Sequence, residues 1–196
     1  MKKMPTLFRR NAGAKIKAFN EVTPGCEWVT AGEGVATEKV DGAACAIING
    51  ELYRRYDANP KKGRKAPVEG IPCQDAPDPV SGHWPFWVRV IDGVKSDQYF
   101  TRAFLNTPWC REGGTYEAVG KHFQGNPYEL DDDFLEKHGR IVLKDCPRDY
   151  WGIMQYLEDH EIEGVVFHRG NGEMCKIKRS DFGIMWPTGG ENGKKL

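Results

Sequence analysis

Two Asn-Gly dipeptides constrain the fold of this chain more than any other feature. They stand at positions 49–50 and 171–172, and each separates two short runs of β-prone residues. Both residues of an Asn-Gly pair tolerate a positive φ, so the pair favours the tight turn that joins two antiparallel strands. The sequence therefore predicts β-hairpins around these two positions and a fold rich in antiparallel sheet.

Further strands are expected where aromatic and β-branched residues gather. Such residues are concentrated at positions 86–91, 98–104 and 115–119, and they are enriched in strands because they pack well on a pleated surface. The first 36 residues mix basic residues with Gly and Pro and predict strands and loops. The first half of the chain is thus expected to be mainly sheet.

Two helices are expected in the second half of the chain. The acidic residues at 131–133 favour the cap of a short helix that ends at Gly139. Pro147 suits the first turn of a second helix, in which apolar residues recur with helical spacing. The apolar face of this second helix is expected to comprise Tyr150, Trp151, Met154 and Leu157. Together, these patterns predict an α+β fold of antiparallel sheets with a few helices.

The length of 196 residues fits one domain, which we place at residues 1–187. Within it, the proline-rich and basic segment at residues 58–82 breaks regular structure and is expected to be a long surface excursion. The Gly- and Lys-rich residues 188–196 are expected to form a flexible tail.

Composition excludes several classes of function. The 28 Lys and Arg residues are balanced by 28 Asp and Glu residues, so any site for a polyanion must be a local patch. The six cysteines form no C-x-x-C pair and are expected to be reduced thiols. The chain has no signal-type apolar stretch at its start and no run of about 18 apolar residues. We therefore expect an intracellular, cytoplasmic protein.

The second hairpin predicts a cluster of charges. If Asn171 and Gly172 are the two loop residues, Phe167 lies opposite Lys176 and Val165 lies opposite Lys178. Side chains alternate between the faces of a strand, so one face is expected to gather Glu163, Val165, Phe167, Lys176 and Lys178. A solvated face that merely keeps the protein soluble fits the same pattern, and this alternative stays open.

Lys39 lies in the string Glu38-Lys39-Val40-Asp41-Gly42, directly before the first predicted hairpin. A lysine amine becomes a nucleophile when its surroundings keep it partly neutral, and its attack on the α-phosphate of a nucleotide would form a lysyl phosphoramidate. The same string also fits a turn with a solvated lysine, so the string alone does not decide between the two.

The order and spacing of five motifs give a more specific indication. They are Lys39-x-Asp41-Gly42, Arg54-Arg55-Tyr56-Asp57, Tyr116-Glu117 with Gln124-Gly125-Asn126-Pro127-Tyr128, Glu163-Gly164-Val165-Val166, and Lys176-Ile177-Lys178. This series resembles the lysine nucleotidyltransferases, which comprise DNA ligases, RNA ligases and mRNA capping enzymes. Residues 37–42, 125–128, 162–166 and 183–187 look most like the ATP-dependent 5′-to-3′ RNA ligases of the vertebrate type and their small bacterial and viral relatives.

This resemblance implies a fold and a set of catalytic residues. The fold would be an antiparallel-sheet nucleotidyltransferase domain, the ATP-grasp-like adenylylation domain of ligases. Lys39 would become covalently adenylylated, and Asp41 would orient it or cap the turn. Lys176 and Lys178 would grip the α-phosphate, and Glu163 would organise a divalent metal beside the nucleotide.

The resemblance also implies how the nucleotide is bound. Glu38 would read the adenine edge, and Val165 would pack on the base. Glu117 would hold the ribose hydroxyls. Arg55, or its neighbour Arg54, would contact a ribose or the 5′-phosphate of an RNA.

The implied reaction consumes ATP with Mg²⁺ or Mn²⁺ and joins RNA. Lys39 attacks ATP and releases pyrophosphate, AMP passes to an RNA 5′-phosphate, and an RNA 3′-hydroxyl then displaces AMP. Each step is an in-line displacement at phosphorus that depends on positioning and charge neutralisation. The expected partner is RNA with 5′-phosphate and 3′-hydroxyl ends, and no membrane is expected to take part.

Three other functions compete with this interpretation. A DNA ligase or a GTP-using capping enzyme shares the motif series, but these enzymes carry an OB-fold domain after the second motif lysine, and only 18 residues follow Lys178 here. A non-catalytic nucleotide- or RNA-binding module is the third alternative. The RNA-binding surface stays open, and the basic run at residues 61–65 and the basic N-terminal residues are candidates for it.

Overall fold

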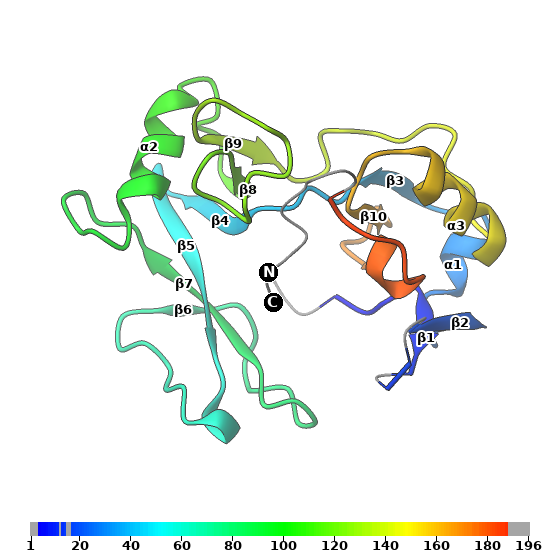
Figure 1. Cartoon of the computed structure of the whole chain (residues 1–196). Coiled ribbons are helices and arrows are strands. Elements are labelled where there is room, and N and C mark those ends of the chain that lie inside the picture. The colour runs from blue at the N-terminus through cyan, green and yellow to red at the C-terminus, as the bar shows by residue number, and fades with distance from the viewer. Residues whose placement is uncertain (1–3, 12, 15–16, 188–196) are drawn as a thin grey trace. The chain divides into compact units, whose positions relative to one another are not determined.

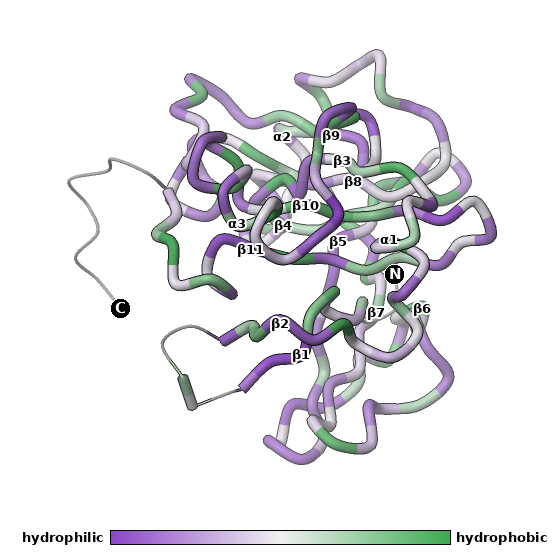
Figure 2. The backbone as a smooth tube through the Cα atoms, turned by 90° about the vertical axis from the view of Figure 1, so that its right-hand side faces the viewer, coloured by the Kyte–Doolittle hydropathy of each residue, from purple (hydrophilic) through white to green (hydrophobic). Residues whose placement is uncertain are grey.

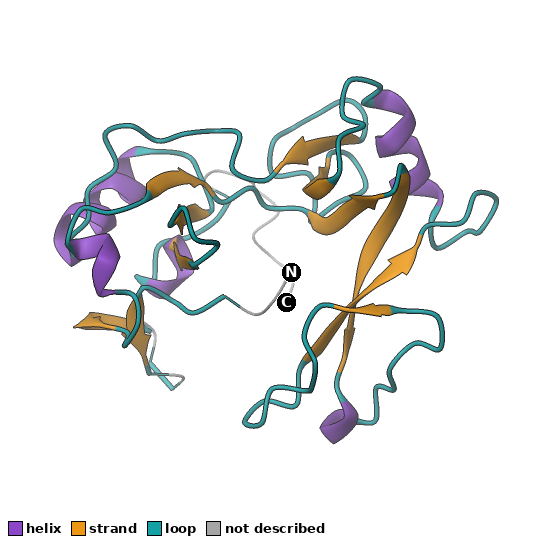
Figure 3. Cartoon of the chain, turned by 180° about the vertical axis from the view of Figure 1, so that it is seen from behind, coloured by secondary structure: helices purple, strands orange, loops and turns teal. Residues whose placement is uncertain are grey.

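The computed structural model describes residues 4–11, 13–14 and 17–187 of the chain (Figure 1). These residues form a mixed α and β structure in which strands dominate the regular elements, as Figure 3 shows. The elements are β1 (Phe8–Arg10), β2 (Ala18–Val22), α1 (Glu27–Thr30), β3 (Val35–Glu38), β4 (Ala43–Ile48), β5 (Glu51–Ala58), η1 (Pro60–Lys62), β6 (Ile71–Pro72), β7 (Trp84–Arg89), α2 (Gln98–Asn106), β8 (Gly114–Val119), β9 (Phe134–Lys137), α3 (Tyr150–Asp159), β10 (Gly164–His168), β11 (Met174–Lys178) and η2 (Arg179–Asp181).

The described residues divide into two compact units. One unit, here called the inserted unit, is the continuous stretch 41–138, and the other, the split unit, combines residues 4–40 with 139–187. The chain therefore passes from the split unit into the inserted unit after Val40 and returns after His138. The single domain predicted for residues 1–187 stays a prediction.

The inserted unit contains a six-stranded sheet in the order β6-β7-β5-β4-β8-β9, with every neighbouring pair antiparallel. The long strands β5 and β7 run side by side (Figure 1). Side chains from one face of the sheet pack against α2 in a common core that includes Cys45, Ile47, Tyr116 and Ala103. We call this the core face of the sheet, and the opposite face is the one that carries Ala44 and Glu117.

The split unit contains the antiparallel sheet β11-β10-β3 and the separate hairpin β1-β2. Its core joins Val165, Phe167 and Ile177 of the three-stranded sheet to Ile153 and Leu157 of α3. The chain before β1 pairs with the free edge of β11, and residues 141–143 pair with the free edge of β3. Both edges of this small sheet are thus covered by other segments of the same unit.

The first predicted hairpin is confirmed. β4 and β5 pair with Ile48 opposite Glu51, and Asn49 and Gly50 adopt φ values of 52° and 81°. Two successive positive φ angles are the conformation for which an Asn-Gly pair is suited. The coarse prediction of mixed helices and antiparallel sheets is also confirmed.

Two predicted elements were wrong in type. Residues 98–104 were expected to form a strand, but they lie in α2 because Tyr99, Phe100 and Phe104 all pack on the core face of the neighbouring sheet. The helix expected after residues 131–133 is instead β9, which pairs with β8. In both cases tertiary packing overrides a weak local propensity.

The second predicted helix is present as α3, with a corrected start and face. Its N-cap is Asp149, whose side chain accepts a hydrogen bond of 2.9 Å from the backbone N–H of Gly152. Pro147 therefore precedes the cap and is not in the first turn. Trp151 is 62% exposed, and Ile153 is fully buried in its place on the apolar face.

The proline-rich segment at residues 58–82 is largely exposed and contains only the short elements η1 and β6. Lys61 connects the two ends of this segment, because its Nζ donates to the carbonyl oxygens of Pro79 (2.6 Å) and Val80 (3.1 Å). The predicted tail at residues 188–196 lies outside the described residues.

All six cysteines lie in the described part of the chain, and none of them forms a disulfide bond. No helix among the described residues has both the length and the apolar character needed to cross a bilayer. Burial raises the pKa of Cys45 and Cys175, which are fully buried in the cores of the two units. These two residues therefore act as small core residues.

Candidate active site

Two lysines and one carboxylate meet in the split unit. Lys39 follows β3, and its Nζ forms an ion pair with Oε2 of Glu163. The Nζ of Lys178, at the end of β11, lies 3.3 Å from the other oxygen, Oε1. The side chains of Lys39, Glu163 and Lys178 are 18%, 10% and 32% exposed. One carboxylate thus bridges two ammonium groups, all of which are partly shielded from water.

Strand pairing brings these three residues together from distant parts of the sequence. The backbone N–H of Lys39 donates to the carbonyl oxygen of Gly164 at 2.8 Å, and Gly164 lies opposite Lys178. A Cβ atom on Gly164 would lie only 2.3 Å from the carbonyl oxygen of Ile177. Glycine at this position therefore allows β10 and β11 to approach closely where the charged groups meet.

The register of the second hairpin differs by one residue from the prediction. Gly164, and not Val165, lies opposite Lys178. The loop contains three residues, because the N–H of Arg169 donates to the carbonyl oxygen of Glu173 at 2.8 Å and Gly172 adopts a φ of 87°. Gly172 thus takes the left-handed position of a longer loop, and a two-residue turn does not form.

This register corrects the predicted face of Val165 and Phe167. Both are fully buried in the core of the split unit together with Ile177, so alternation places Lys176 and Lys178 on the opposite face of the sheet. Val165 is therefore separated from the lysines by the sheet itself. Glu163 still reaches Lys178 because it precedes β10 and does not follow the alternation of that strand.

Lys176 and Glu38 are fixed by backbone hydrogen bonds at opposite edges of the sheet. The N–H of Lys176 donates to the carbonyl oxygen of Pro5 at 3.0 Å, while its own carbonyl accepts from Leu7 at 2.8 Å. The N–H of Glu38 donates to the carbonyl oxygen of Ile141 at 2.9 Å. The two flanking segments thus hold the strands that carry these predicted site residues.

Asp181 supports the position of Lys178 and was not expected from the sequence. Its carboxylate is 1% exposed, and Oδ2 accepts a hydrogen bond of 3.0 Å from the backbone N–H of Lys178. Its Oδ1 lies 2.9 Å from Nε of Arg10 on β1, the mainly hydrophilic strand in Figure 2. Lys178 is not one of the residue types that mark a helix N-cap in a sequence, so no sequence signal identified this contact.

Arg54 and Arg55 have different environments in the inserted unit. Arg54 lies opposite Cys45 and therefore on the core face of the sheet, where its Nε lies 2.7 Å from Oδ1 of Asp97. Arg55 points to the opposite face. Only Arg55 thus shares a face with Glu117, which is 8% exposed and lies opposite Ala44.

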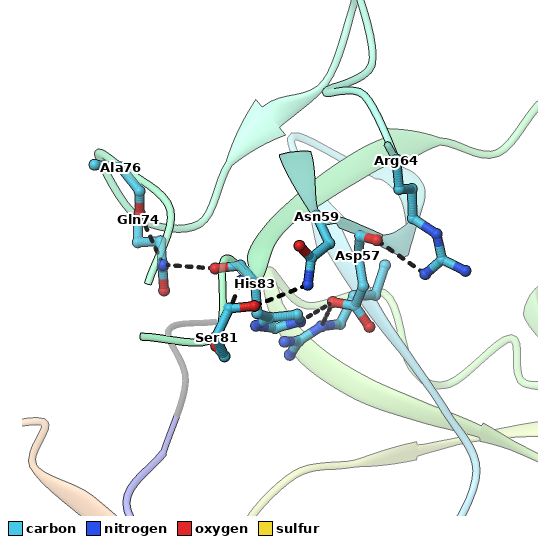
Figure 4. A network of polar contacts seen from close by, with 8 residues as sticks. Asp57, Asn59, Arg64, Gln74, Ala76, Ser81 and His83 are labelled. Carbon is cyan, nitrogen blue, oxygen red and sulfur yellow. Dashed lines mark hydrogen bonds and ion pairs between the residues drawn. The ribbon is translucent and has the colours of Figure 1, made fainter. Parts of the chain in front are cut away.

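Asp57 holds Arg55 at the base of the proline-rich excursion. Its Oδ1 accepts hydrogen bonds of 2.8 Å from Nε of Arg55 and from Nε2 of His83, and its backbone carbonyl accepts one of 3.0 Å from Arg64. Figure 4 shows Asp57 between His83 and Arg64. Burial alone would raise the pKa of Asp57, but the contacts with Arg55 and His83 bring it below the usual value.

The Asp41-Gly42 segment is held by the loop that follows β8. The N–H of Asp41 donates to the hydroxyl of Tyr128 at 2.7 Å, and the side-chain amide of Gln124 donates to the carbonyl oxygen of Gly42 at 3.0 Å. A Cβ atom on Gly42 would lie 2.3 Å from the carbonyl oxygen of Ala118. The Gly-Asn-Pro-Tyr motif therefore supports the turn that follows Lys39.

The predicted site residues divide between the two units. The structure brings Lys39, Glu163 and Lys178 into direct contact, with Glu38, Lys176 and Val165 in the same unit. Asp41, Arg54, Arg55 and Glu117 belong to the inserted unit. The sequence did not identify His138, whose Nε2 lies 3.0 Å from Oε2 of Glu117.

Comparisons with known proteins give one consistent result. A family model described as RNA ligase 1 matches residues 110–193. The chain is similar to RNA ligase 1 of Mus musculus, with 26% identity in an alignment of 223 positions, gaps included, that covers 78% of this chain and 68% of that protein. RNA ligase 1 of Rattus norvegicus and RNA ligase 1 of Danio rerio are each 25% identical to this chain. Both alignments cover the same shares of the two chains, 78% and 68%.

These similarities support a relationship to RNA ligases. The segment matched by the family model contains Glu117, Glu163, Lys176 and Lys178, and it begins after Lys39. For Lys39, the argument rests on its motif and on its contact with Glu163.

Proposed function

We propose that this chain is an ATP-dependent RNA ligase that joins RNA 5′-phosphate and 3′-hydroxyl ends through a covalent Lys39–AMP intermediate. The observation that carries this proposal is the contact of Lys39, Glu163 and Lys178, three residues from widely separated motifs. A lysine that is partly shielded beside a second cation is the setting expected for a nucleophilic amine that attacks a phosphate. The similarity to RNA ligase 1 favours RNA as the substrate.

Lys39 begins the reaction by leaving its ion pair with Glu163 and giving a proton to the solvent. Its neutral Nζ then attacks the α-phosphorus of ATP. The new N–P bond forms as the bond from the α-phosphorus to the pyrophosphate oxygen breaks, and pyrophosphate leaves. Lys178, and Lys176 on the same face of the sheet, neutralise the charge that builds on the α-phosphate oxygens.

The two later steps transfer the same AMP group. An oxygen of the RNA 5′-phosphate attacks the phosphorus of the lysyl-AMP and releases Lys39. The 3′-hydroxyl of the second RNA end then loses its proton and attacks the 5′-phosphate, and AMP leaves. The Lys39 amine that was released in the second step takes up a proton from the solvent and re-forms its ion pair with Glu163.

Mg²⁺ or Mn²⁺ fits this site as an ion that arrives with the nucleotide. Among the described residues, no group of three or more His, Cys, Asp or Glu side chains is arranged to hold a metal. Glu163 offers a single carboxylate, and a magnesium ion bound to substrate phosphates needs only one or two protein carboxylates. Glu163 would be that ligand, and the ion would supply charge neutralisation at the phosphate oxygens.

The first experiment tests for the covalent intermediate. The intact mass of the purified protein is measured first, because an AMP group carried through purification would block labelling. The protein is then incubated with α-labelled ATP or GTP and Mg²⁺. A labelled adduct with ATP is expected for the native protein and for Lys95→Ala, an exposed lysine to which no role is assigned.

Two variants of the nucleophile should form no adduct. Lys39→Ala removes the amine. Lys39→Arg keeps a cation beside Glu163 but cannot form the lysyl phosphoramidate, so loss of the adduct in this variant reflects the missing nucleophile and not the loss of the ion pair. A native protein with neither bound nor newly formed AMP would refute the proposal and favour a non-catalytic binding module. Labelling by GTP in place of ATP would favour a capping-type enzyme.

The second experiment tests end joining. A labelled RNA with a 5′-phosphate and a 3′-hydroxyl is incubated with the protein and ATP, beside a DNA of the same sequence. We expect ligated or circularised RNA and an RNA-adenylate that accumulates when the 3′-hydroxyl is absent. Joining of the DNA alone would contradict the assignment to RNA.

A further inference from the structure

Residues 59–65 of the inserted unit form a loop, here called the basic loop, that exposes a row of cations to solvent. No acidic residue lies between Asp57 and Glu69, so nothing within the loop balances this charge. Exposed charges of one sign attract ligands of the opposite sign. The balanced charge of the chain requires any polyanion site to be a local patch, and the basic loop is such a patch. Its exposed cations are Lys61, Lys62, Arg64 and Lys65.

Backbone hydrogen bonds close the basic loop. The N–H of Asn59 donates to the carbonyl oxygen of Arg64 at 2.8 Å, and the N–H of Arg64 donates back to the carbonyl oxygen of Asn59 at 3.0 Å. Between these two residues, η1 is followed by Gly63, whose φ of 74° lies in the left-handed region that glycine adopts without strain. The cations are therefore presented from a closed turn of backbone.

A second loop, residues 78–83, holds the basic loop in place. The side-chain amide of Asn59 donates to the carbonyl oxygen of Ser81 at 3.0 Å (Figure 4). The Nζ of Lys61 donates to two backbone carbonyl oxygens of the second loop. Gly82 allows the two loops to approach, because a Cβ atom there would lie 2.8 Å from Cγ of Lys61. Lys61 is thus engaged in fixing the basic loop.

The other three cations have no acidic partner. In the part of the chain that the structure describes, no ion pair involves Lys62, Arg64 or Lys65. Arg64 donates from Nη1 to the backbone carbonyl oxygen of Asp57 at 3.0 Å, and the carboxylate of Asp57 accepts from two side chains outside the basic loop. The two lysine ammonium groups and the remaining N–H groups of Arg64 are therefore available to an external anion.

We propose that the basic loop binds the phosphate backbone of the RNA substrate, with Lys62, Arg64 and Lys65 as the contacting cations. This inference rests on the proposed function of the chain, and the surface lies wholly within the inserted unit. Lys and Arg side chains neutralise backbone phosphates and release their counterions, which makes such binding sensitive to salt. A loop that is already fixed by Lys61 loses less conformational freedom on binding, and this favours affinity.

The test measures the affinity for a fluorescent single-stranded RNA by anisotropy at several salt concentrations. The RNA carries a 5′-hydroxyl, so it presents backbone phosphates but cannot be adenylylated at that end. The double variant Lys62→Gln with Lys65→Gln removes two cations of the basic loop. Lys95→Gln with Lys144→Gln is the matched control, because it removes two exposed lysines to which no role is assigned.

We expect Lys62→Gln with Lys65→Gln to weaken RNA binding by about tenfold at low salt and to reduce the slope of log Kd against log salt by about 1.4, because each phosphate contact to a single strand contributes about 0.7. The control pair should keep the native affinity and slope. Lys62→Arg with Lys65→Arg should keep them too, because both charges are retained. Lys61→Met should weaken binding with an unchanged slope, because it frees the loop without removing a phosphate contact.

Four results would overturn the proposal. A native affinity and slope in Lys62→Gln with Lys65→Gln, or an equal loss in the control pair, would show that the basic loop does not contact the RNA. Native affinity in Lys61→Met would refute the role of the fixed loop. Binding to phosphatidylserine vesicles that is lost in the Lys62→Gln with Lys65→Gln variant, while RNA binding is unchanged, would assign the loop to a membrane surface.

Formation of the lysyl-AMP separates this inference from the proposed function. It requires no RNA, so all these variants should form the lysyl-AMP at the native rate. A native protein that forms no lysyl-AMP, and carries none, would refute the proposed function, whereas the RNA affinities decide the role of the basic loop. Urea unfolding of each variant shows whether it is folded.

Discussion

A methyl group added at Gly164 is expected to weaken both the fold of the split unit and its chemistry. The Cβ atom of alanine would lie 2.3 Å from the carbonyl oxygen of Ile177 and 2.9 Å from Cα of Lys178. Both contacts are with backbone, so relief requires β10 and β11 to separate by about 1 Å. Overpacking of this kind typically costs about 1–3 kcal/mol.

The same separation moves Lys178 away from Glu163. Their present distance is 3.3 Å between Nζ and Oε1, so a shift of about 1 Å ends the ion pair. A misplacement of about 1 Å in a catalytic site lowers rates by about 100-fold. We therefore expect Gly164→Ala to form the lysyl-AMP about 100 times more slowly than the native protein.

Gly170→Ala is the matched control, because a Cβ at Gly170, in the loop of the same hairpin, would meet no atom within 4 Å. With an m-value of about 2 kcal/mol per M, the urea midpoint of Gly164→Ala should fall by about 0.5–1.5 M, while that of Gly170→Ala should stay within about 0.25 M. Equal midpoints and equal rates in the two variants would refute the argument from close approach.

Three further predictions concern the support of the site. Gly42→Ala should lower the free energy of unfolding by about 1–3 kcal/mol in urea titrations, because its Cβ would lie 2.3 Å from the carbonyl oxygen of Ala118. Burial alone would raise the pKa of Asp97, but its hydrogen bonds, including that from Arg54, lower it. The ionised Asp97 therefore stabilises the protein above about pH 4, and this stabilisation is lost as the pH falls through the folded-state pKa of Asp97. Urea midpoints should therefore fall on acidification more steeply in the native protein than in Asp97→Asn. Asp149→Ala removes the N-cap of α3 and should cost about 1 kcal/mol, seen as a lower melting temperature by circular dichroism.

The sequence was most informative where local chemistry decides the structure. The turn at Asn49-Gly50 was predictable because both residues can adopt positive φ. The second Asn-Gly pair gave the hairpin but not its register, because Gly172 also suits the left-handed position of a three-residue loop. A shift of one residue exchanges the faces of a strand, so Val165 was assigned to the wrong face.

For the candidate site as well, the sequence identified the residues that stand in motifs and missed those that support them through tertiary contacts. Lys39, Glu163 and Lys178 stand in recognisable motifs, so they could be singled out before their contact was known. Asp181 and His138 support these motifs through contacts that exist only in the folded chain. Such supports were not predictable from residue type alone, because a buried histidine or aspartate has many other uses.

The division of the chain has a consequence for synthesis on the ribosome. Hairpins and neighbouring strands make up the inserted unit, so we expect it to fold early, because local contacts form fast. The split unit must wait, since β3 pairs with a strand whose residues lie far along the chain, as in the hydrogen bond from Thr37 to Val166 across 129 positions. Until β10 leaves the ribosome, β3 exposes an unpaired edge that is prone to aggregation. The order of synthesis therefore leaves the segment that ends in Lys39 without its sheet partner until β10 has been made.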